Sequence, residues 1–561
     1  MLNKLFDRLQ DWRMYRKRDQ LDWISRNTAL VQKHQKEFAA TIAKNSQKED
    51  RKKILFWYSG IWERGGAEHM LMLSLKLRGH KIIGIRCSGG IPACSMESTL
   101  YPRPKCSDCV ERSEKLLGIL SLLDDCETTT DYLQTINYQN LFKEIDDKPI
   151  EELIHMEYEG VPIGRFTLRD LPQYFFRLVD ISDENVAKRF RESLKGVLQY
   201  TIVAFEALKK HNPDRTIVTS GKTIGYGSFY EACKVKGVPV VTWDESVGGM
   251  CSFVFDSHHF AVEYRKNEAW NRISQEGLSG KEREFVSYYF GKTSKGQFGR
   301  HVYYNNPITS KQEICRKLGL DENKPILTLL TNLSWDTSAL GRDIAFDSML
   351  GWIYDTIEYT QKQDFFQLVI RTHPAEGHVG KYARGCESVS EIVNEKYPHL
   401  PDHINIISGK DEINSHALCD LSQQIAVYAT TVGLEMAVKG RQVMVCGDRD
   451  YRGKGFTIDI ETKKEYFDYL GSPSFFSQTT ISEPQRDLAI KYAYFFIVRI
   501  ESYLPEFNLE DRHSFEINDP RDFLPNHSKR WDSLCENLLS GGDFVDCTDY
   551  IDPWKSMEKK T

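Results

Sequence analysis

Residues 367–376, QLVIRTHPAE, join a short apolar run to side chains that can do chemistry. The run predicts a buried strand, and Arg371 and His373 follow it directly. Pro374 lacks an N–H and biases His373 towards an extended backbone, so the strand must end there and the imidazole must point out of the sheet. In open α/β sheets, ligands bind at the carboxyl ends of strands. We therefore expect both side chains to face a bound ligand, with an ordinary strand-to-loop exit as the alternative.

Other hydrogen-bonding groups of the same half also follow predicted strands. Thr430 and Thr431 come after a predicted strand at 425–428 and open a helix, whose free N–H groups favour anions. Glu435 lies one helical turn further on, where it can hold a ribose, and GDRDYRGKGFT is a cationic, glycine-rich loop. The candidate nucleotide-binding residues of this half are Asn332, Ser334, Trp335, Asp336, Arg371, His373, Thr430, Thr431, Gly433, Glu435, Tyr451 and Lys454.

The first half carries candidates for a general base. Asp244 and Glu245 end the predicted strand in VPVVTWDES, and neighbours on an extended chain point to opposite sides, so only one of them can face a cleft. The alternative is that both are solvated loop acids. A glycine loop with Glu63, Gly65 and Gly66 follows an earlier strand. It either contacts a substrate, on the side where a hydroxyl acceptor would bind, or forms a tight structural turn.

Four cysteines form a separate cluster with the spacing C-x6-C-x11-C-x2-C. Cys87, Cys94, Cys106 and Cys109 lie in a segment broken by prolines, and four thiolates can hold Zn²⁺ or a [4Fe–4S] cluster. The sequence does not separate these two metals. We expect a metal site here, with unligated or redox thiols as the alternative.

Strands alternating with helices must position these groups. KILFWY at 53–58, a helix at 70–77 and a strand at 81–85 form a βαβ unit, and a similar unit begins at 216–220. The fold class we expect is α/β, with two Rossmann-like domains. We expect the chain to divide into four segments. These are a basic amphipathic helical extension at 1–50, an acceptor domain with the cysteine cluster at 51–300, a nucleotide-sugar domain at 321–485, and a C-terminal helix and tail at 486–561.

Composition excludes several other classes of protein. The chain has 561 residues, ordinary globular composition and a net charge of −6, which argues against a general nucleic-acid binder. It has no apolar run long enough to span a membrane, and its charged N-terminus is not a signal peptide, so we expect a cytoplasmic protein. The basic N-terminal helix can lie on an anionic membrane at the inner face, or dock on its own protein or a second subunit.

The segments NLSWDTS, GWIYDTI, QLVIRTHPAE, TTVGLEMAVKG and DRDYRGKGFT, in this order, resemble the bacterial capsular-polysaccharide biosynthesis proteins. These are glycosyltransferases related to the Kdo- and sialic-acid-transferring families with a His-Pro motif. The similarity is good over about 320–470 and looser over 215–265, and it does not clearly cover 1–50, 110–200 or the tail.

The resemblance implies a GT-B architecture, in which the active site lies between two Rossmann-like domains. It implies that Arg371 and His373 meet the donor phosphate, that Thr430, Thr431 and Glu435 hold phosphate and ribose, and that an acid of the first half is the base. The chain lacks a DxD-type metal motif at a plausible site, apart from the weak Asp448-Arg449-Asp450, so donor binding is expected to be independent of Mg²⁺.

These expectations combine into a glycosyltransferase that moves a sugar from a nucleotide-activated donor to a surface-polysaccharide acceptor, such as a lipid-linked capsule or O-antigen-like intermediate. The alternatives are a polyol-phosphate transferase of the teichoic-acid kind and a non-catalytic scaffold of a glycan-assembly complex. The expected partners are a nucleotide sugar and a glycan acceptor, with the membrane surface, a second copy of the chain or assembly proteins as further possibilities.

Overall fold

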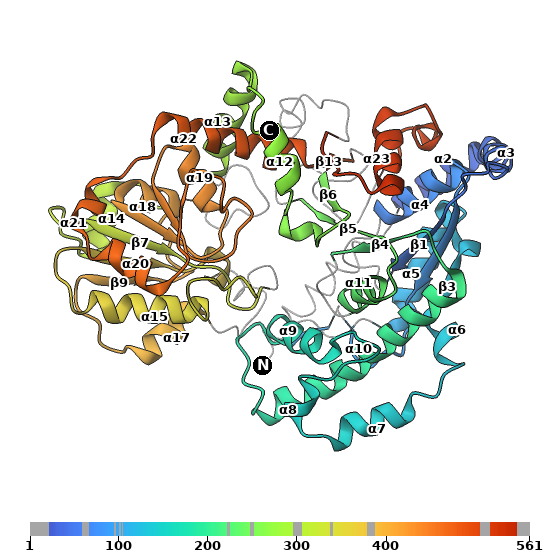
Figure 1. The fold of residues 1–561 in the computed structure, drawn as a ribbon, viewed down its shortest axis with the longest axis horizontal. Helices are drawn as coiled ribbons and strands as arrows, with labels where there is room; N and C mark the ends of the chain where they lie inside the picture. The colour runs from blue at the N-terminus through green and yellow to red at the C-terminus, as the bar shows by residue number, and fades with distance from the viewer. Residues whose placement is uncertain are drawn as a thin grey trace.

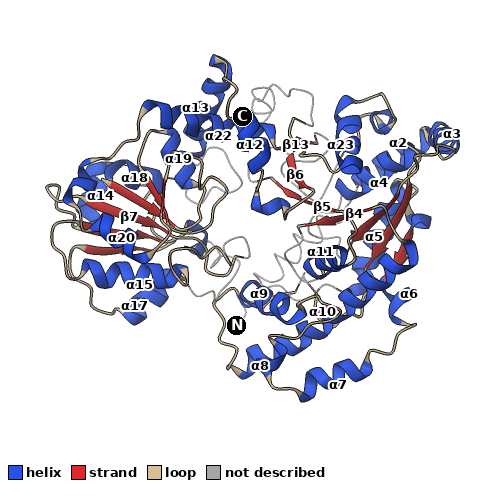
Figure 2. Cartoon of the chain, in the orientation of Figure 1, coloured by secondary structure: helices blue, strands red, loops and turns tan. Residues whose placement is uncertain are grey.

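The computed structural model folds the chain into two α/β lobes, seen at the right and left of Figure 1. Their strands form two separate sheets, each flanked by helices (Figure 2). The structure describes residues 22–58, 67–94, 97–99, 103, 105–220, 225–246, 252–294, 306–336, 340–377, 388–504 and 516–546.

The first domain is built on a seven-stranded sheet with the order β13-β6-β5-β4-β1-β2-β3. The strands from β5 to β3 are parallel, whereas β6 and β13 add antiparallel strands at one edge. The order reverses between β1 and β4, which creates a crevice at their carboxyl ends. The strand bounds are β1 Lys53–Tyr58, β2 Lys81–Arg86, β3 Cys126–Thr128, β4 Arg215–Thr219, β5 Val240–Glu245, β6 Ser252–Asp256 and β13 Ser502–Tyr503.

The central strand β1 is apolar from Ile54 to Trp57 because helices cover both faces of the sheet. Leu55 and Trp57 pack in the core with α9, α10 and α11, and Ile54 and Phe56 pack in the core with α4 and α5. The helices of this domain are α4 Ala67–Leu77, α5 Cys106–Ile119, α6 Thr129–Leu133, α7 Gln139–Asp147, α8 Ile150–Leu153, α9 Ile163–Phe175, α10 Glu184–His211 and α11 Tyr226–Val235.

The second domain has a six-stranded parallel sheet with the order β12-β11-β10-β7-β8-β9, the strand order of dinucleotide-binding Rossmann folds. The structure therefore confirms the predicted α/β class with two Rossmann-like domains. The strands are β7 Ile326–Leu330, β8 Gln367–Arg371, β9 Ile404–Ile407, β10 Gln424–Val427, β11 Val443–Val445 and β12 Ile458–Asp459. The helices are α14 Lys311–Leu318, α15 Met349–Thr360, α17 Val389–Lys396, α18 Ser415–Leu421, α19 Val432–Val438, α20 Lys463–Leu470, α21 Pro473–Ser477 and α22 Glu483–Tyr494.

The chain passes between the domains twice. It leaves the first domain after β6 through α12 Asn267–Ile273 and α13 Gly280–Ser294, which pack on α22. It returns after α22 through a π-helical turn, Phe495–Arg499. Then β13 joins the first sheet, and α23, Lys529–Ser540, packs on α4 with Trp531 fully buried. The segment that the sequence set apart as a C-terminal helix and tail is thus shared: its start, in α22, packs on α19 of the second domain, whereas β13 and α23 pack on the first.

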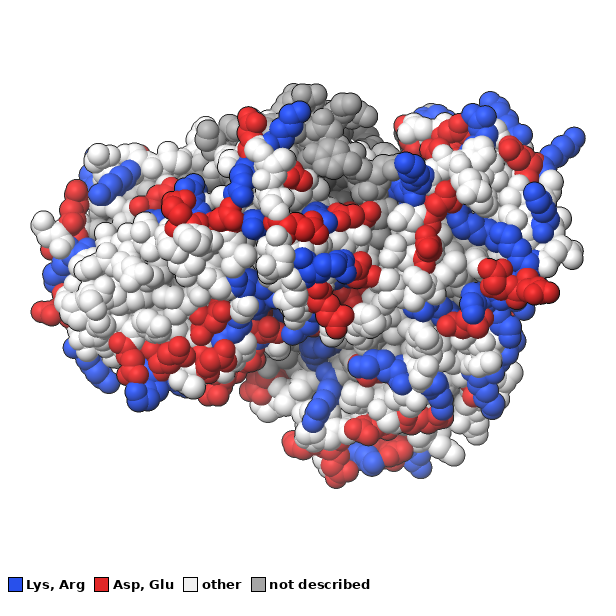
Figure 3. Space-filling view, turned by 45° about the horizontal axis from the view of Figure 1, so that its top comes forward, with Lys and Arg blue, Asp and Glu red and all other residues white. Residues whose placement is uncertain are grey.

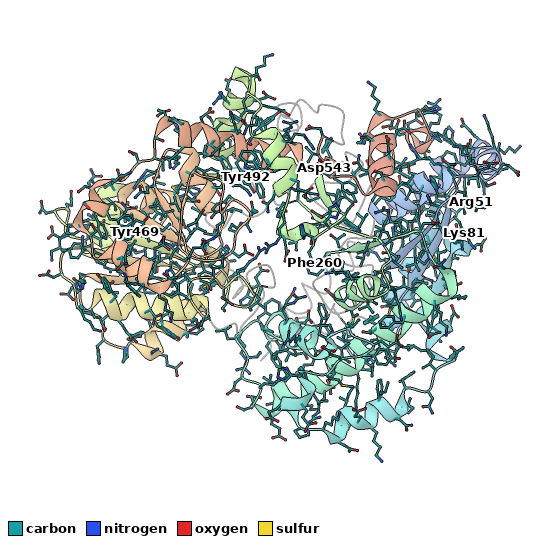
Figure 4. All side chains as sticks on the ribbon, in the orientation of Figure 1. Arg51, Lys81, Phe260, Tyr469, Tyr492 and Asp543 are labelled. Atoms are coloured by element: carbon teal, nitrogen blue, oxygen red, sulfur yellow. The ribbon has the colours of Figure 1, made fainter. Side chains whose placement is uncertain are left out.

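Ion pairs hold the two crossings together. Lys266 forms a buried ion pair with Asp256 (3.0 Å) and donates to the carbonyl of Asp543 (2.9 Å). Arg499 pairs with Asp546 and Glu276. Figure 4 shows Asp543 at the top of the molecule, between the lobes.

At the N-terminus, α2 Asp22–Lys33 and α3 Gln35–Asn45 pack on α5 and α4 of the first domain. Val31 and Phe38 are buried there, and the Asn27 side chain accepts the backbone N–H of Ile517 (2.9 Å). This part of the predicted extension is therefore docked on its own protein, and residues 1–21, which carry the predicted membrane-binding face, lie outside the described residues. No helix in the described ranges combines the length and the apolar character needed to span a bilayer.

Candidate functional site

The sheet order of the second domain reverses between β7 and β10, and Asn332 links the ends of these strands. Its Nδ2 donates to the carbonyl of Ala429 (3.2 Å) and its Oδ1 accepts the N–H of the same residue (3.0 Å). The side chain thereby extends the β7–β10 pairing beyond Leu330. Both ends of the Asn332 amide thus bind backbone, and its role in nucleotide binding stays a prediction.

Tyr451 shapes the turn between β10 and α19. It is fully buried, and its hydroxyl donates to the carbonyl of Thr430 (2.6 Å). Gly433 makes room for it, since a Cβ at this position would lie 2.3 Å from the hydroxyl oxygen. Both residues were predicted to contact nucleotide, but the structure uses them inside the protein to hold this turn.

Thr430 and Thr431 remain at the carboxyl edge of the sheet, half-buried. The Thr430 hydroxyl accepts the N–H of Val432 (3.4 Å), and the Thr431 side chain caps no helix N–H group. Hydroxyls beside the first N–H groups of a helix are suited to an anion, so the predicted role of both residues is compatible with their position.

His373 follows β8, two residues after the strand ends, and is half-buried. Its Nδ1 accepts the backbone N–H of Ala375 (3.1 Å). The proton of the neutral ring therefore resides on Nε2, which makes that nitrogen a hydrogen-bond donor. The predicted role of His373, donation to a developing negative charge, needs this tautomer.

Arg371 does not point towards a ligand, contrary to expectation. It is 1% exposed, and its guanidinium donates to the carbonyls of Ser408, Asp411 (3.1 Å) and Ile413 (3.2 Å) and to the Ser415 hydroxyl (3.4 Å). The three carbonyls belong to the loop after β9, and Ser415 is the first residue of α18. The guanidinium is thus engaged inside the domain, so we withdraw its predicted contact with the donor phosphate.

Glu435 pairs with His416, a residue that the sequence analysis overlooked. The His416 Nε2 lies 2.6 Å from the Glu435 Oε2, and both side chains are largely buried. His416 stands in the first turn of α18, so the only signal in the sequence was a polar helix start after a strand. Its side chain also lines a cavity of about 360 Å³, within the range of small-molecule sites.

Other predicted residues of this domain are spread apart. The Trp335 ring packs edge-on against Phe176 of the first domain, with ring centroids 4.7 Å apart, so it bridges the two domains. The Lys454 ammonium donates to the Asn267 side chain on α12. Ser334 is buried and Asp336 is half-buried.

The two acids of the first domain lie within β5 and not beyond it. The strand runs to Glu245, which pairs with Phe253 of β6. Asp244 is 5% exposed and accepts the N–H of Glu245 (2.7 Å), whereas Glu245 is half-buried. Because β6 pairs with both residues, they lie in one arm of a β-hairpin and not at a free strand end. The two carboxylates point to opposite faces of the sheet.

A further carboxylate lies at the β1/β4 crevice. Glu68, in the first turn of α4, is buried and accepts hydrogen bonds from the Thr219 hydroxyl and the Trp243 indole (3.2 Å). Burial lowers the pKa of the adjacent His69 to about 4, so this imidazole is neutral at pH 7. The predicted acceptor residues Glu63, Gly65 and Gly66, in the preceding loop, lie outside the described residues.

The side chains of the four clustered cysteines have other contacts in the described structure. Cys87 accepts from the Tyr200 hydroxyl (3.9 Å), Cys106 accepts from Arg103 (3.5 Å), and Cys109 packs against the apolar core. Within the described ranges, no three His, Cys, Asp or Glu side chains are arranged to hold a metal ion. The predicted zinc or iron–sulfur site, which included Cys94, is therefore not supported by the described residues.

No protein-family model and no curated protein matches this chain. Among solved structures, the chain is similar to two KpsC enzymes of Thermosulfurimonas dismutans. The beta Kdo 2,4 transferase has 12% identity and a TM-score of 0.33, over 50% of this chain and 79% of that chain. The beta Kdo 2,7 transferase has 14% identity and a TM-score of 0.32, over 60% of this chain and 88% of that chain.

A UDP-GlcNAc 2-epimerase from Neisseria meningitidis is also similar, with 9% identity and a TM-score of 0.25, over 78% of this chain and 98% of that chain. Such low identities and TM-scores do not extend the activities of these enzymes to this chain. The assignment of the fold rests on the strand orders of the two sheets.

Proposed function

We propose that the protein is a glycosyltransferase that moves a sugar from a nucleotide-activated donor to a hydroxyl of a surface-polysaccharide acceptor. The observation that carries the proposal is the arrangement at the carboxyl edge of the second sheet. There His373 is held as an Nε2–H donor, and Thr430 and Thr431 stand at a helix start. Neutral groups that donate hydrogen bonds suit the diphosphate or monophosphate of a nucleotide sugar.

The reaction we propose balances without a metal ion. The acceptor oxygen forms a bond to the anomeric carbon while the bond from that carbon to the donor phosphate oxygen breaks. The departing phosphate takes the electron pair and is stabilised by His373 and the threonines. The acceptor proton passes to a carboxylate of the first domain, for which Glu245 and Asp244 are the candidates if the reaction inverts configuration.

The nucleoside would lie against α18 and α19. The Glu435–His416 pair and the adjoining cavity support this placement, because a carboxylate can accept from ribose hydroxyls and the cavity admits a planar base. Polysaccharide precursors are commonly lipid-linked, so the acceptor would be presented at the inner face of the membrane.

One end of the first domain carries unpaired positive charge that would suit such a membrane. Lys48, Arg51, Lys52 and Lys81 are exposed, and none of them pairs with a carboxylate among the described residues. Figure 4 shows Arg51 and Lys81 at the end farthest from the second domain. Elsewhere on the face in Figure 3, positive and negative side chains are interspersed.

Nucleotide binding and donor consumption test the proposal. A thermal-shift screen with UDP, GDP, CMP and CDP should give one nucleotide that raises the melting temperature, because a ligand specific for the native state stabilises it. The corresponding nucleotide sugars should then be hydrolysed slowly or transferred to extracted glycolipid. A protein that binds none of the four nucleotides and consumes no nucleotide sugar would not be this enzyme.

A further inference from the structure

The backbone that carries His373 presses against the loop after β9. His373 is followed by a helical turn over residues 374–377, and Gly377 of this turn meets Gly409 backbone to backbone. A Cβ at Gly377 would lie 2.2 Å from the Gly409 carbonyl oxygen, and a Cβ at Gly409 would lie 2.7 Å from the His373 carbonyl oxygen. Neither position has room for a side chain, so a displacement of Gly409 must displace the His373 backbone.

The guanidinium of Arg371 holds this loop from inside. Three backbone carbonyls between Ser408 and Ile413 turn inward and accept from it, and they come from residues on both sides of Gly409. A planar fork with five donors can satisfy several carbonyls at once, whereas an ammonium is a compact point charge.

Two ion pairs reach this loop, and both are exposed. Lys317 lies 3.1 Å from Asp411 and Lys410 lies 3.9 Å from Glu391, and all four side chains are more than a third exposed. Exposed ion pairs contribute little to stability. The buried guanidinium therefore supports the backbone around Gly409 from the interior, beside the loop's own hydrogen bonds between Ser408 and Asp411.

We propose that Arg371 is a positioning residue: through the 408–413 loop and the Gly377–Gly409 contact, it fixes the orientation of the His373 imidazole without touching substrate. This inference rests on the proposed function, in which His373 donates to the leaving phosphate. The same backbone turn presents the Ala375 N–H to the His373 Nδ1. Displacement of the loop would therefore also weaken the hydrogen bond that keeps the ring proton on Nε2.

A double-mutant cycle tests whether Arg371 acts through His373. Arg371→Lys should lower kcat by 10-fold to 100-fold, on the order expected when a catalytic group is misplaced by about 1 Å, and leave the donor KM within about threefold. In a His373→Ala background the same substitution should have no further effect on kcat. An equal loss in both backgrounds, or a raised KM with unchanged kcat, would overturn the proposal.

Arg441→Lys is the matched control. This guanidinium also donates to backbone carbonyls, those of Cys419 (2.9 Å), Thr479 (3.2 Å) and Ser422, but it precedes β11, at the opposite edge of the sheet. Arg441→Lys should change kcat by less than about threefold. A hydrogen bond lost at this position lowers the stability of the fold but leaves the geometry at the carboxyl edge of the sheet unchanged. If Arg371→Lys does not fold, Gly409→Ala disturbs the same contact and should lower kcat in the same His373-dependent way.

The His373 tautomer provides a readout that does not depend on turnover. In protein labelled with ¹⁵N-histidine, the resonances that vanish in His373→Ala identify this ring. They should show an Nε2–H tautomer in the parent protein and a mixture in Arg371→Lys or Gly409→Ala. An unchanged tautomer in both variants would refute positioning by Arg371. A changed tautomer in a protein whose His373→Ala variant keeps full turnover would instead refute the proposed function and leave the positioning intact.

Discussion

At the scale of single residues, the His373 side chain carries the proposed chemistry. Its Nε2–H would donate to a charge that grows on the leaving phosphate, so the contact is stronger in the transition state than in the ground state. We predict that His373→Ala lowers kcat by about 10²-fold, the scale of one lost charge-stabilising donor, with donor KM nearly unchanged. His399→Ala, at an exposed position of the same domain, is the control. Steady-state kinetics with the identified donor would measure both, and unimpaired turnover would remove His373 from the mechanism.

A second residue beside it should make stability depend on pH. Burial raises the pKa of Glu376 to about 7, with the nearby Arg371 charge opposing the rise. Protonation of the folded state then stabilises it fully below pH 4.5, the ordinary value, and this contribution is lost as the pH rises through about 7. At about 1.4 kcal/mol per pKa unit, the loss is on the order of 3 kcal/mol.

Glu376→Gln should abolish this part of the pH dependence. Urea unfolding at a series of pH values from about 4.5 to 8 would measure it, since the substituted amide cannot titrate in that range. The exposed Glu395→Gln should leave the profile of the parent protein unchanged. If Glu376→Gln retains the full decline of stability between these pH values, other groups cause it.

At the scale of elements, the position of the β10–α19 turn depends on residues from two other strands. Asn332 after β7 and Tyr451 after β11 both bind backbone of this turn. We predict that Asn332→Ala costs about 1–3 kcal/mol of stability, because it leaves polar groups of Ala429 without their partner. It should also weaken nucleotide binding, since Thr430 adjoins that residue.

Asn271→Ala, on the exposed face of α12, provides the comparison for this prediction. Chemical denaturation and nucleotide titration would measure stability and affinity. A variant that is destabilised but binds nucleotide like the parent protein would show that the Asn332 bridge supports the fold alone.

The strands and helices were largely predictable, because their signals are local. The apolar run at 53–58 is β1, and the predicted helix at 70–77 lies within α4. The roles of the site residues were less predictable. Arg371 was correctly placed at a strand end, but its acceptors are carbonyls of residues 408–413, which no local pattern relates to it. The metal site predicted from the cysteine spacing is likewise not supported by the described residues.

At the scale of the whole molecule, the exposed cations of the first domain predict where it meets a membrane. Changing Lys48, Arg51, Lys52 and Lys81 to Glu should reduce sedimentation with anionic liposomes by 10-fold or more, since each basic residue near the surface contributes about 1 kcal/mol. The parent protein should also release liposomes as salt is added, because the charges are exposed.

The control for this experiment is the same number of charge reversals among exposed lysines of the second domain, such as Lys362 and Lys464. These should leave liposome binding unchanged. If both sets reduce it equally, only net charge matters, and if neither does, this surface does not meet the membrane.

The return of the chain to the first domain also sets the order in which the protein can fold as it is made. α4 is synthesised early, but α23, which covers it, comes almost last. At about 5–20 residues per second, translation of residues 78–528 takes tens of seconds, during which this apolar face has no cover from the chain itself. The second domain is continuous in sequence and can fold on the ribosome first. The domain that begins the protein is therefore the last to be completed, and nascent chains released before α23 should depend on chaperones or aggregate.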